Sequence, residues 1–492
     1  MTALSRRTLL AAGSAGALTA CSSEPAGRPG SGAPSGAAVP SSPTPATPTG
    51  VPWQALARAL EGDLVRPASP SYSSLRVTPN PRFDSARPLA LAEVASAQDV
   101  ATVLRFAADH GVPLALRSGG HSYPGWSAGD RRLVVDCRRL SGIGWTGTDV
   151  TMGPGRHLAD VYAGVAGRGR AVPGGSCPTV GVGGLTLGGG VGVLTRAYGL
   201  TCDHLVAAQA VLPSGEVVTA SPDDHDDLYW ALRGGGGGHT AVVTSMTFST
   251  VVAPTIVSTY LTWPAAQAPT VVPAWFAWMG SADARAWSTI KLLAGAAHPD
   301  GPTLGATVTW VGPASGFDAV LAPILATGPT ARYDHTRDYL SAMQAYAGTG
   351  AREAFAATSH VAYAPPASGA LGDLVAAVAT TPGTLQEAGF SIDALGGHVG
   401  DLAPTETAFV HREARATVQY TATYTSGGPA PARSYVERLR RHMTPTWGEH
   451  AYVNYADPSL ADPGDAYFGD NWGRLQEVRS SYDPDGLLTQ PQ

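Results

Sequence analysis

Several features are scarce or missing in this 492-residue sequence, and each one argues against a class of protein. No internal hydrophobic run is long enough to cross a membrane. The net charge is −6 and basic residues form no run, which argues against a nucleic-acid partner. The sequence contains no His-x-x-x-His pair with an acidic partner, so a metal site is not expected. Lysine occurs once, at Lys291, and the sequence alone does not connect this bias to a function.

Cysteine is also scarce, with four residues in the whole chain. This number is too small for a disulfide framework. Cys21 belongs to an N-terminal signal, and Cys177 lies in a glycine-rich stretch. Cys137 and Cys202 are expected to be buried free thiols, and a disulfide between them stays open for an exported protein.

The N-terminus has the features of an export signal over residues 1–21. Ser5-Arg6-Arg7-Thr8-Leu9-Leu10 is a twin-arginine pattern, and Leu18-Thr19-Ala20-Cys21 resembles a lipoprotein cleavage box, in which Cys21 carries the lipid. The alternative is a twin-arginine signal cut nearby, which leaves a soluble protein. Residues 22–50 consist almost wholly of Ser, Pro, Ala, Gly and Thr, which predicts a disordered linker.

Glycine, in contrast, is abundant, and two clusters stand out. Residues 174–192 hold one cluster, with Cys177 inside it, and Arg117-Ser118-Gly119-Gly120-His121-Ser122 holds the other. Glycine lets backbone amides approach a ligand more closely than any residue with a Cβ, and successive amides form an anion site. Tight loops without a ligand are the alternative interpretation. The pairing of two clusters, each with one nucleophilic side chain, favours a bound flavin nucleotide.

The rest of the chain predicts an α+β fold. Ser96 caps a helix with an apolar face that ends at Gly111, and a strand at residues 112–116 leads into the first glycine cluster. Later elements are expected as the strands 132–136, 150–152, 205–211, 216–220, 240–252, 303–311 and 417–424, and as the helices 157–166, 226–233, 317–326, 371–380 and 435–442. From about residue 256 the pattern predicts an antiparallel sheet with helices on one face.

Together these motifs resemble the berberine bridge enzyme-like oxidases of the vanillyl-alcohol oxidase group. The resemblance rests on the two glycine clusters and on further motifs that extend from about residue 75 to the C-terminus. These are Tyr198-Gly199-Leu200, Trp230-Ala231-Leu232-Arg233-Gly234-Gly235-Gly236, Phe409-Val410-His411-Arg412, Asn454-Tyr455 and Tyr482-Asp483-Pro484-Asp485. It implies a PCMH-type FAD-binding domain over 51–255, a substrate domain over 256–425 and a segment over 426–492 that returns to the FAD domain.

The resemblance also implies a cofactor site. His121 would bond the flavin 8α-methyl carbon and Cys177 the flavin C6, so that FAD is attached twice. The other residues that it places around FAD are Arg117, Ser118, Gly119, Gly120, Ser122, Gly175, Val180, Gly181, Gly183, Gly184, Val243 and Asn454.

The catalytic residues implied by the resemblance are Tyr455 and Asp393. Tyr455 would remove a hydroxyl proton while a hydride leaves for flavin N5. A tyrosine with a pKa near 10 is a poor base at neutral pH and needs a neighbour. Asp393 is the candidate assistant, and the alternative is a loop aspartate that caps backbone amides. Val180 is a residue that leaves room for dioxygen in relatives of this kind.

Two motifs depart from the family pattern. His239-Thr240-Ala241 stands where relatives read Asn-Phe-Gly, and Val410 replaces a proline. Neither change touches the two linkage residues. The sequence therefore predicts an exported FAD oxidase that acts on an alcohol carbon of a sugar or a hydroxylated secondary metabolite and releases H2O2. A dehydrogenase of the same fold and a non-catalytic ligand-binding lipoprotein are the alternatives, and the substrate is not identified.

Overall fold

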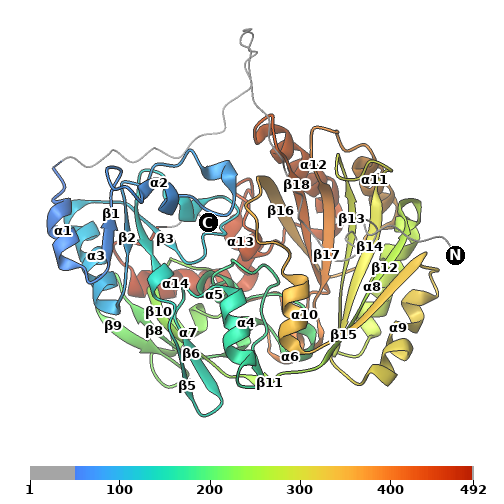
Figure 1. The fold of residues 1–492 in the computed structure, drawn as a ribbon, viewed down its shortest axis with the longest axis horizontal. Helices are drawn as coiled ribbons and strands as arrows, with labels where there is room; N and C mark the ends of the chain where they lie inside the picture. Colours follow the sequence, from blue (N-terminus) through green and yellow to red (C-terminus); the bar gives the residue numbers. More distant parts are fainter. Residues whose placement is uncertain (1–49, 490–492) are drawn as a thin grey trace, which may run out of the picture.

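The computed structural model describes residues 50–489 (Figure 1). The predicted signal with Cys21 and nearly all of the predicted linker lie outside the described residues. No helix of residues 50–489 is long and apolar enough to cross a membrane.

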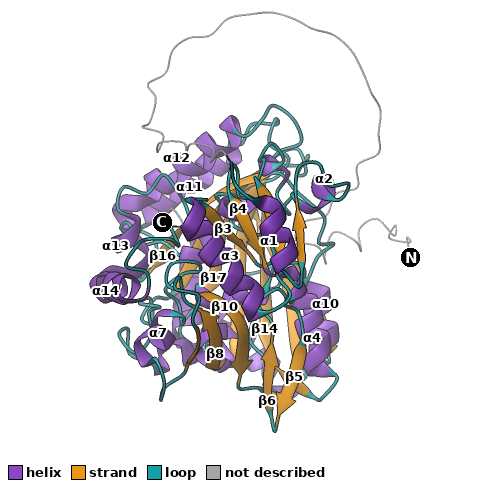
Figure 2. Cartoon of the chain, turned by 90° about the vertical axis from the view of Figure 1, so that its left-hand side faces the viewer, coloured by secondary structure: helices purple, strands orange, loops and turns teal. Residues whose placement is uncertain are grey.

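The N-terminal half begins with a four-stranded sheet in the order β1-β2-β4-β3. Strands β2 and β3 both run parallel to β4, which lies between them. Helices α1 and α3 pack side by side against this sheet (Figure 2). Its strands are β1 (Asp63–Val65), β2 (Ala90–Glu93), β3 (Leu114–Arg117) and β4 (Leu133–Asp136). The helices of this half are α1 (Trp53–Ala59), α2 (Tyr72–Leu75), α3 (Ala97–His110), α4 (Leu158–Ala166), α5 (Val182–Leu187), α6 (Thr195–Tyr198) and α7 (Asp226–Ala231).

Helix α3 begins and ends where the sequence predicts. The Ser96 side chain accepts a hydrogen bond from the Asp99 amide at 3.2 Å, and Gly111 ends the helix with φ +60°. A left-handed residue at this position favours glycine because it has no Cβ. Strand β3 follows at once and delivers the chain to the loop with His121.

A second, five-stranded antiparallel sheet in this half has the order β5-β6-β10-β8-β9. Its strands are β5 (Ile143–Thr146), β6 (Asp149–Met152), β8 (Leu205–Val211), β9 (Val217–Ala220) and β10 (Val242–Phe248). The predicted single strand over 240–252 is wrong. The chain leaves the sheet after Phe248, where the Ser249 amide donates to the His204 carbonyl at 2.8 Å. It then forms β11 (Val251–Val252), which pairs with β7 (Arg170–Ala171).

The C-terminal half is built on a seven-stranded antiparallel sheet in the order β15-β12-β14-β13-β17-β18-β16. Helices α8, α11 and α12 pack against one face of it, which confirms the predicted α+β arrangement (Figure 1). The strands are β12 (Ile256–Pro264), β13 (Ala286–Ala294), β14 (Thr303–Trp310), β15 (Ala331–Arg337), β16 (Phe355–Ala362), β17 (Ala388–Ala394) and β18 (Ala416–Thr423). The helices are α8 (Ala268–Ser281), α9 (Phe317–Leu325), α10 (Tyr339–Tyr346), α11 (Ser368–Ala379) and α12 (Ala430–Trp447).

Side chains alternate along these strands, as the pleat requires. On β13, Ile290 and Leu292 are fully buried on the helix-covered side, whereas Thr289 and Lys291 line a cavity on the other side. On β17, Ile392 is fully buried and Asp393 lines the same cavity. The sheet therefore turns an apolar face to its helices and a largely polar face to the N-terminal half.

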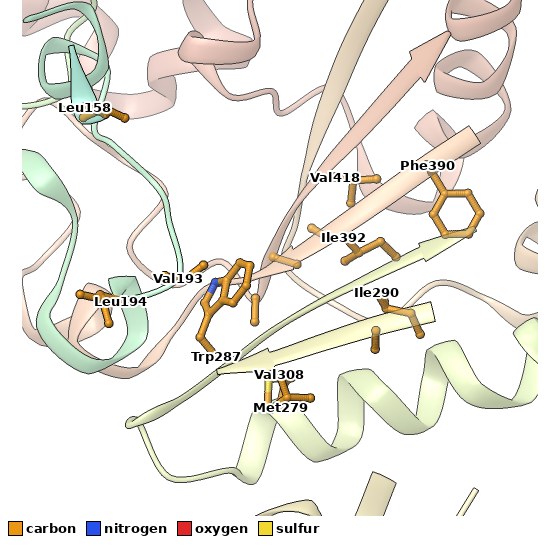
Figure 3. Close-up of a cluster of buried hydrophobic side chains, with 14 of the residues drawn as sticks. Leu158, Val193, Leu194, Met279, Trp287, Ile290, Val308, Phe390, Ile392 and Val418 are labelled. Atoms are coloured by element: carbon orange, nitrogen blue, oxygen red, sulfur yellow. The ribbon is translucent and has the colours of Figure 1, made fainter. Parts of the chain in front are cut away.

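One buried apolar core extends through both halves. Figure 3 shows Val193 of the N-terminal half beside Trp287 of the large sheet, and both belong, with Leu158, Leu194 and Ile290, to one cluster of buried side chains. The predicted domain limits at 255 and 425 stay a prediction, because this core does not break at either position.

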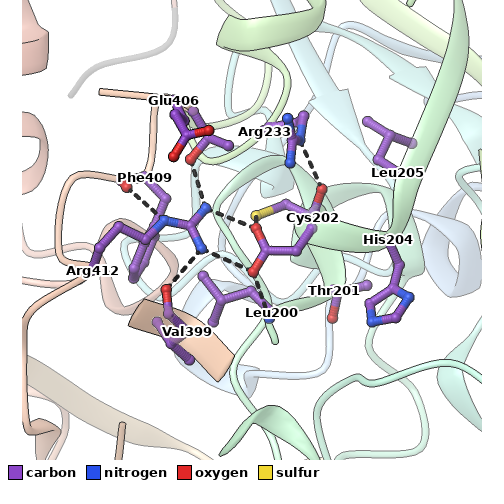
Figure 4. Close-up of polar contacts among 12 residues, drawn as sticks. Leu200, Thr201, Cys202, His204, Leu205, Arg233, Val399, Glu406, Phe409 and Arg412 are labelled. Carbon is purple, nitrogen blue, oxygen red and sulfur yellow. Dashed lines mark hydrogen bonds and ion pairs between the residues drawn. The ribbon is translucent and has the colours of Figure 1, made fainter. Parts of the chain in front are cut away.

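A buried ion pair also joins the two halves. The Arg412 guanidinium, which is 1% exposed, donates to both Asp203 carboxylate oxygens at 2.7 and 2.8 Å. It donates to the Thr407 hydroxyl and the Val399 carbonyl as well (Figure 4). Arg412 follows β17 and Asp203 follows α6, so the pair fixes one half against the other.

The chain ends with α13 (Pro463–Phe468) and α14 (Trp472–Tyr482), which return to the N-terminal half (Figure 1). Helix α14 packs against α7, and the Tyr482 hydroxyl donates to Asp227 at 2.7 Å. Just before these helices, residues 453–455 form a short 3-10 turn that reaches the cavity.

Candidate active site

A cavity of about 1540 Å³ lies between the glycine-rich loops and the polar face of the large sheet. This volume exceeds that of an ordinary small-molecule site and leaves room for a cofactor and a substrate together. All sixteen residues that the sequence singled out line it. They are His121, Cys177, Arg117, Ser118, Gly119, Gly120, Ser122, Gly175, Val180, Gly181, Gly183, Gly184, Val243, Asn454, Tyr455 and Asp393.

His121 and Cys177 come from separate loops and meet at one threonine. The His121 Nε2 lies 2.9 Å from the Thr179 Oγ1, and the Cys177 Sγ lies 3.8 Å from the same oxygen. Burial lowers the pKa of His121 to about 4, and His157 acts in the same direction. The imidazole is therefore neutral at physiological pH, which is the form with a free nitrogen lone pair for nucleophilic attack.

The two glycine clusters pack backbone against backbone. A Cβ placed on Gly181 would overlap the Ser118 hydroxyl and the Gly119 amide, and one placed on Gly119 would overlap the Gly181 amide. Here glycine is required by a close approach of two loops. In residues 50–489, the amides of Gly119, Gly120 and His121 donate no hydrogen bond to another residue. Consecutive free amides form an anion-binding concavity.

The side chains of three predicted cofactor-binding residues form hydrogen bonds within the protein. The Arg117 guanidinium donates to the Ser127 and Leu75 carbonyls at 2.8 Å and lies 3.6 Å from Asp136. The Ser118 hydroxyl donates to the Pro154 carbonyl at 2.6 Å. The Asn454 amide donates at 2.9 Å to the Leu185 carbonyl of α5 and to the Tyr452 hydroxyl. These side chains shape the loops, and Arg117 and Ser118 offer mainly their backbone to a ligand.

Three tyrosines form an aromatic group at the cavity. Tyr455 stacks on Tyr123 with ring centroids 5.3 Å apart and planes 6° apart, and Tyr452 meets Tyr455 edge-on at 5.0 Å. The Tyr123 hydroxyl accepts a hydrogen bond from the Gln419 amide of β18. Burial raises the pKa of Tyr455 well above its usual value, and the charges of Asp393 and the other tyrosines raise it further. Tyr455 is therefore a neutral phenol unless a neighbour takes its proton.

Asp393 lies in strand β17, between Thr289 of β13 and Thr417 of β18. The alternative interpretation of Asp393 as a loop residue is wrong, because the residue belongs to the strand and faces the cavity. Burial raises the pKa of Asp393, while Thr289 and the positive charge of Lys291 act in the opposite direction. A carboxyl of this kind beside a phenol is suited to accept a proton.

The structure brings further residues to this cavity that the sequence motifs did not single out: Tyr123, Thr179, Gln419, Tyr452 and Lys291. Tyr123 follows directly after His121 and Ser122 in the sequence. Gln419 and Lys291 are polar residues at alternating strand positions, where the pleat gives them the same face as Asp393. The alternation was visible, but the pairing of these strands was not.

The site fits FAD on the evidence of its own residues. The unpartnered amides of the first glycine cluster suit a pyrophosphate, and the close packing at Gly119 and Gly181 keeps the neighbouring backbone free of side chains. His121 and Cys177 would hold the flavin ring. Within residues 50–489, no group of three or more His, Cys, Asp or Glu side chains is placed to hold a metal ion.

Comparison with known proteins agrees with this geometry. The FAD binding domain family matches residues 88–221, and the berberine and berberine-like family matches residues 451–492. YgaK of Bacillus subtilis, an uncharacterized FAD-linked oxidoreductase, is 30% identical over 441 residues, which cover 87% of this chain and 96% of that protein. Chitooligosaccharide oxidase of Gibberella zeae is 28% identical and covers 82% of this chain and 87% of its own.

Among solved structures, glucooligosaccharide oxidase from Acremonium strictum, described with a 6-S-cysteinyl, 8α-N1-histidyl FAD, has a TM-score of 0.80 at 25% identity. The match covers 89% of this chain and 98% of that chain. The fold and the glycine-lined cavity define a flavoprotein oxidoreductase by class. The chain belongs, more narrowly, to the berberine bridge enzyme-like family of FAD-linked oxidoreductases, with the PCMH-type FAD-binding fold. Its family and its enzyme class are those that the sequence predicted.

Proposed function

We propose that this protein is an exported oxidase whose FAD is bonded to both His121 and Cys177, and that it oxidises an alcohol carbon of a sugar or a hydroxylated secondary metabolite. The observation that carries the proposal is the meeting of His121 and Cys177 at Thr179, in the same cavity as Tyr455 and Asp393. Residues 51–255 would bind FAD, residues 256–425 would bind the substrate, and residues 426–492 would return Tyr455 to the FAD side.

Bound FAD supplies a two-electron acceptor for the hydride. The protein supplies the base. We assign removal of the substrate hydroxyl proton to the Tyr455 oxygen, with Asp393 as the carboxylate that takes the phenolic proton. Tyr455 needs such a partner because its pKa is raised: a neutral phenol accepts a proton only as its own proton leaves. Tyr123 stacks on Tyr455 and is hydrogen-bonded to Gln419, so it holds the Tyr455 ring in place.

Polar side chains on the sheet support an alcohol-rich substrate. Ser391, Gln419 and Thr421 line the cavity on two adjacent strands, and Tyr260 and Thr307 line it on two further strands. Hydroxyl and amide groups on a rigid sheet can donate to and accept from substrate hydroxyls. The names of the relatives include two oligosaccharide oxidases, which is consistent with a sugar.

Acid precipitation of the purified protein tests the double linkage. The pellet of the wild type should stay yellow, and so should the pellets of His121→Ala and Cys177→Ala, because one bond remains in each. The double variant should release all flavin to the supernatant. A colourless wild-type pellet would contradict the covalent attachment.

A peroxide-coupled screen over oligosaccharides and hydroxylated secondary metabolites tests the reaction. We expect at least one alcohol to bleach the flavin anaerobically and to produce one H2O2 per turnover in air, with Val180 leaving the oxygen path open. Flavin bleaching without peroxide would identify a dehydrogenase with another acceptor. Absence of bleaching by every alcohol would overturn the proposed reaction.

The proposed location is the cell surface or the medium, reached by the twin-arginine route, with a lipid on Cys21. Fractionation of cells that express the wild type and Cys21→Ala tests it. The wild type should partition with membranes and Cys21→Ala should be released in soluble form. Equal release of both would favour the signal that is cut without lipidation.

A further inference from the structure

Thr179 lies between the two residues that we propose to bond the flavin. Its hydroxyl oxygen is 2.9 Å from the His121 Nε2 and 3.8 Å from the Cys177 Sγ. His121 belongs to the first glycine cluster and Cys177 to the second, so one hydroxyl contacts nucleophiles from two separate loops. A hydroxyl has one hydrogen to donate and two lone pairs, so it can accept from one partner while it donates to the other.

The backbone on both sides of Thr179 is anchored to helix α4. The Pro178 carbonyl accepts a hydrogen bond from the Ala159 amide at 3.0 Å. The Val180 carbonyl accepts one from the Leu158 amide at 2.9 Å. Both amides belong to the first turn of the helix, where amides have no partner within the helix. One helix end therefore holds the backbone before and after Thr179 in place.

The methyl group of Thr179 lies on the side of the loop that follows α10. A Cβ added to Gly350 of that loop would lie 3.5 Å from the Thr179 Cγ2. The hydroxyl lies on the side of His121 and Cys177 instead. Valine at position 179 would therefore keep the methyl group and remove only the hydroxyl.

The His121 imidazole is neutral and has a single N–H. Burial lowers the pKa of His121 to about 4, the charge of His157 acts in the same direction, and the Thr179 carbonyl opposes both as a hydrogen-bond acceptor. The hydrogen bond at one ring nitrogen decides where the other keeps its lone pair. An Nε2–H donated to the Thr179 hydroxyl leaves the lone pair on Nδ1, where it can attack a carbon.

The Thr179 hydroxyl hydrogen is then available to the Cys177 sulfur. A hydrogen bond donated to sulfur stabilises the thiolate, which is the nucleophilic form of cysteine. The oxygen-to-sulfur distance of 3.8 Å is longer than the distance to His121, and sulfur is a weak acceptor. The effect on Cys177 should therefore be the smaller of the two.

We propose that Thr179 is a positioning residue for both flavin bonds: its hydroxyl accepts the His121 Nε2–H, which leaves Nδ1 to attack, and donates to the Cys177 sulfur. This inference rests on the proposed function, since it concerns how the two proposed bonds form.

Both bonds form with the same balance of protons and electrons. In one, Nδ1 of His121 bonds the flavin 8α carbon, which loses a proton, and the imidazole gives up its Nε2 proton. In the other, the Cys177 sulfur loses its proton and bonds flavin C6, which also loses a proton. Each bond thus releases two protons and leaves two electrons on the flavin. Dioxygen takes up both electrons and both protons and becomes H2O2.

The test follows covalent flavin in the full-length protein with time after protein synthesis is stopped. Cys177→Ala reports the His121 bond alone, and His121→Ala reports the Cys177 bond alone. Acid precipitation gives the amount of bound flavin, and mass spectrometry of the peptides gives its site. Adding Thr179→Val should slow the bond at His121 about tenfold, as expected for loss of one hydrogen bond, and the bond at Cys177 about two- to fivefold.

Two further variants separate the hydroxyl from the shape of the side chain. Thr179→Ser keeps the hydroxyl and should retain both rates within about twofold. Thr151→Val is the matched control, because it removes a hydroxyl that also lies 2.9 Å from its partner, Thr247, in the five-stranded sheet. Thr151 is not among the residues that line the cavity, so Thr151→Val should leave both rates unchanged.

Equal rates in Thr179→Val and Thr151→Val would overturn the inference. A loss of the same size in Thr179→Ser as in Thr179→Val would also overturn it, because the shape of the side chain would then be the cause. A slower bond at His121 with an unchanged bond at Cys177 would refute the shared role. NMR of the isolated flavin peptide should show attachment through Nδ1 of His121, and attachment through Nε2 would contradict the assigned hydrogen bond.

Failure of the proposed double attachment gives a different result. In that case the wild type itself would have no covalent flavin at His121 or at Cys177. A wild type with both bonds, together with unchanged rates in Thr179→Val, would overturn only the role of Thr179.

Discussion

At the scale of single residues, the proposed reaction gives the stacked Tyr455 and Tyr123 different roles, with proton transfer at Tyr455 and positioning at Tyr123. Burial raises the pKa of both hydroxyls. Asp393 is the next cause for Tyr455, whereas for Tyr123 Cys177 comes before Asp393. Tyr123 also has a hydrogen bond with Gln419. The two hydroxyls therefore have distinct partners, and removing each one should have a distinct effect.

Tyr455→Phe should lower the rate of flavin reduction by about 10²- to 10⁴-fold, the usual contribution of a general base. The flavin should stay attached, because His121 and Cys177 are unchanged. Stopped-flow absorbance under anaerobic conditions measures the rate. Tyr123→Phe is the matched comparison and should cost less, since it removes a contact to Gln419 and no proton acceptor. Equal rates for Tyr455→Phe and the wild type would remove Tyr455 from the mechanism.

At the scale of elements, the two glycine loops constrain each other. Gly181→Ala would place a Cβ against the Ser118 hydroxyl and the Gly119 amide, so one loop must move. We expect a loss of about 1–3 kcal/mol in the free energy of unfolding together with less covalent flavin. Gly372→Ala in α11 is the control, since nothing lies within 4 Å of the added Cβ. It should be neutral or stabilising by up to about 1 kcal/mol. Denaturant unfolding and flavin content measure both; equal stability of the two variants would contradict the close approach.

The Arg412–Asp203 ion pair is a second contact that holds elements together. Asp203→Asn would leave the Arg412 charge buried without its partner, which should destabilise the protein by about 3–5 kcal/mol. Asp318→Asn breaks an exposed pair with Arg332 and should cost less than about 1 kcal/mol. Thermal or denaturant unfolding of both variants checks the difference. A similar small loss in both would mean that the two halves do not depend on this contact.

Sequence reasoning located the elements that have local signals. Ser96 and Gly111 mark both ends of α3, and Val211 and Val217 flank a turn that does join β8 and β9. Helix α5 was not predicted, because it contains Gly183 and Gly184 and glycine disfavours helix formation. Tertiary contacts override this preference. Helix α12 runs from Ala430 to Trp447, well beyond the predicted 435–442, since Pro431 is tolerated in the first turn of a helix.

The site was predictable in its parts and not in its assembly. The motifs identified the residues on the loops, because His121, Cys177 and Tyr455 lie in distinctive local sequences. Gln419 and Lys291 lie in ordinary strands, and their meaning depends on which strands pair. That pairing places Lys291 beside Ser391, which is 100 positions away in the sequence, and Ser391 in turn beside Gln419. No local pattern contains this information.

At the scale of the whole molecule, buried neutral histidines should make stability depend on pH. Burial lowers the pKa of His360 and of His411 to about 3, and that of His121 to about 4. Below pH 6.5 the unfolded chain binds protons that the folded chain excludes. The histidine contribution to stability is therefore complete above pH 6.5 and is lost as the pH falls from about 6.5 toward 3.

Each such histidine should cost about 1.4 kcal/mol per pH unit in this window. Unfolding free energies at pH 7.0, 6.0 and 5.0 measure the slope for the wild type and for His360→Gln. The variant is expected to be less stable at pH 7.0, and the gap should narrow as the pH falls. A gap of constant size would show that His360 is not held neutral in the folded protein.

The cavity also has a consequence for how the protein is made. Its glycine loops lie in the first half of the chain, while Asn454 and Tyr455 lie near the C-terminus, and the Asn454 amide closes the wall by bonding Leu185 across 269 positions. A chain that emerges from the ribosome N-terminus first exposes His121 and Cys177 long before the rest of the cavity wall exists. The cavity wall is therefore complete only after the C-terminal part of the chain has been synthesised. A transcript with a late stop codon would yield a product that keeps His121 and Cys177 but lacks Tyr455, so the presence of the two residues that we propose to bind flavin does not by itself indicate intact enzyme.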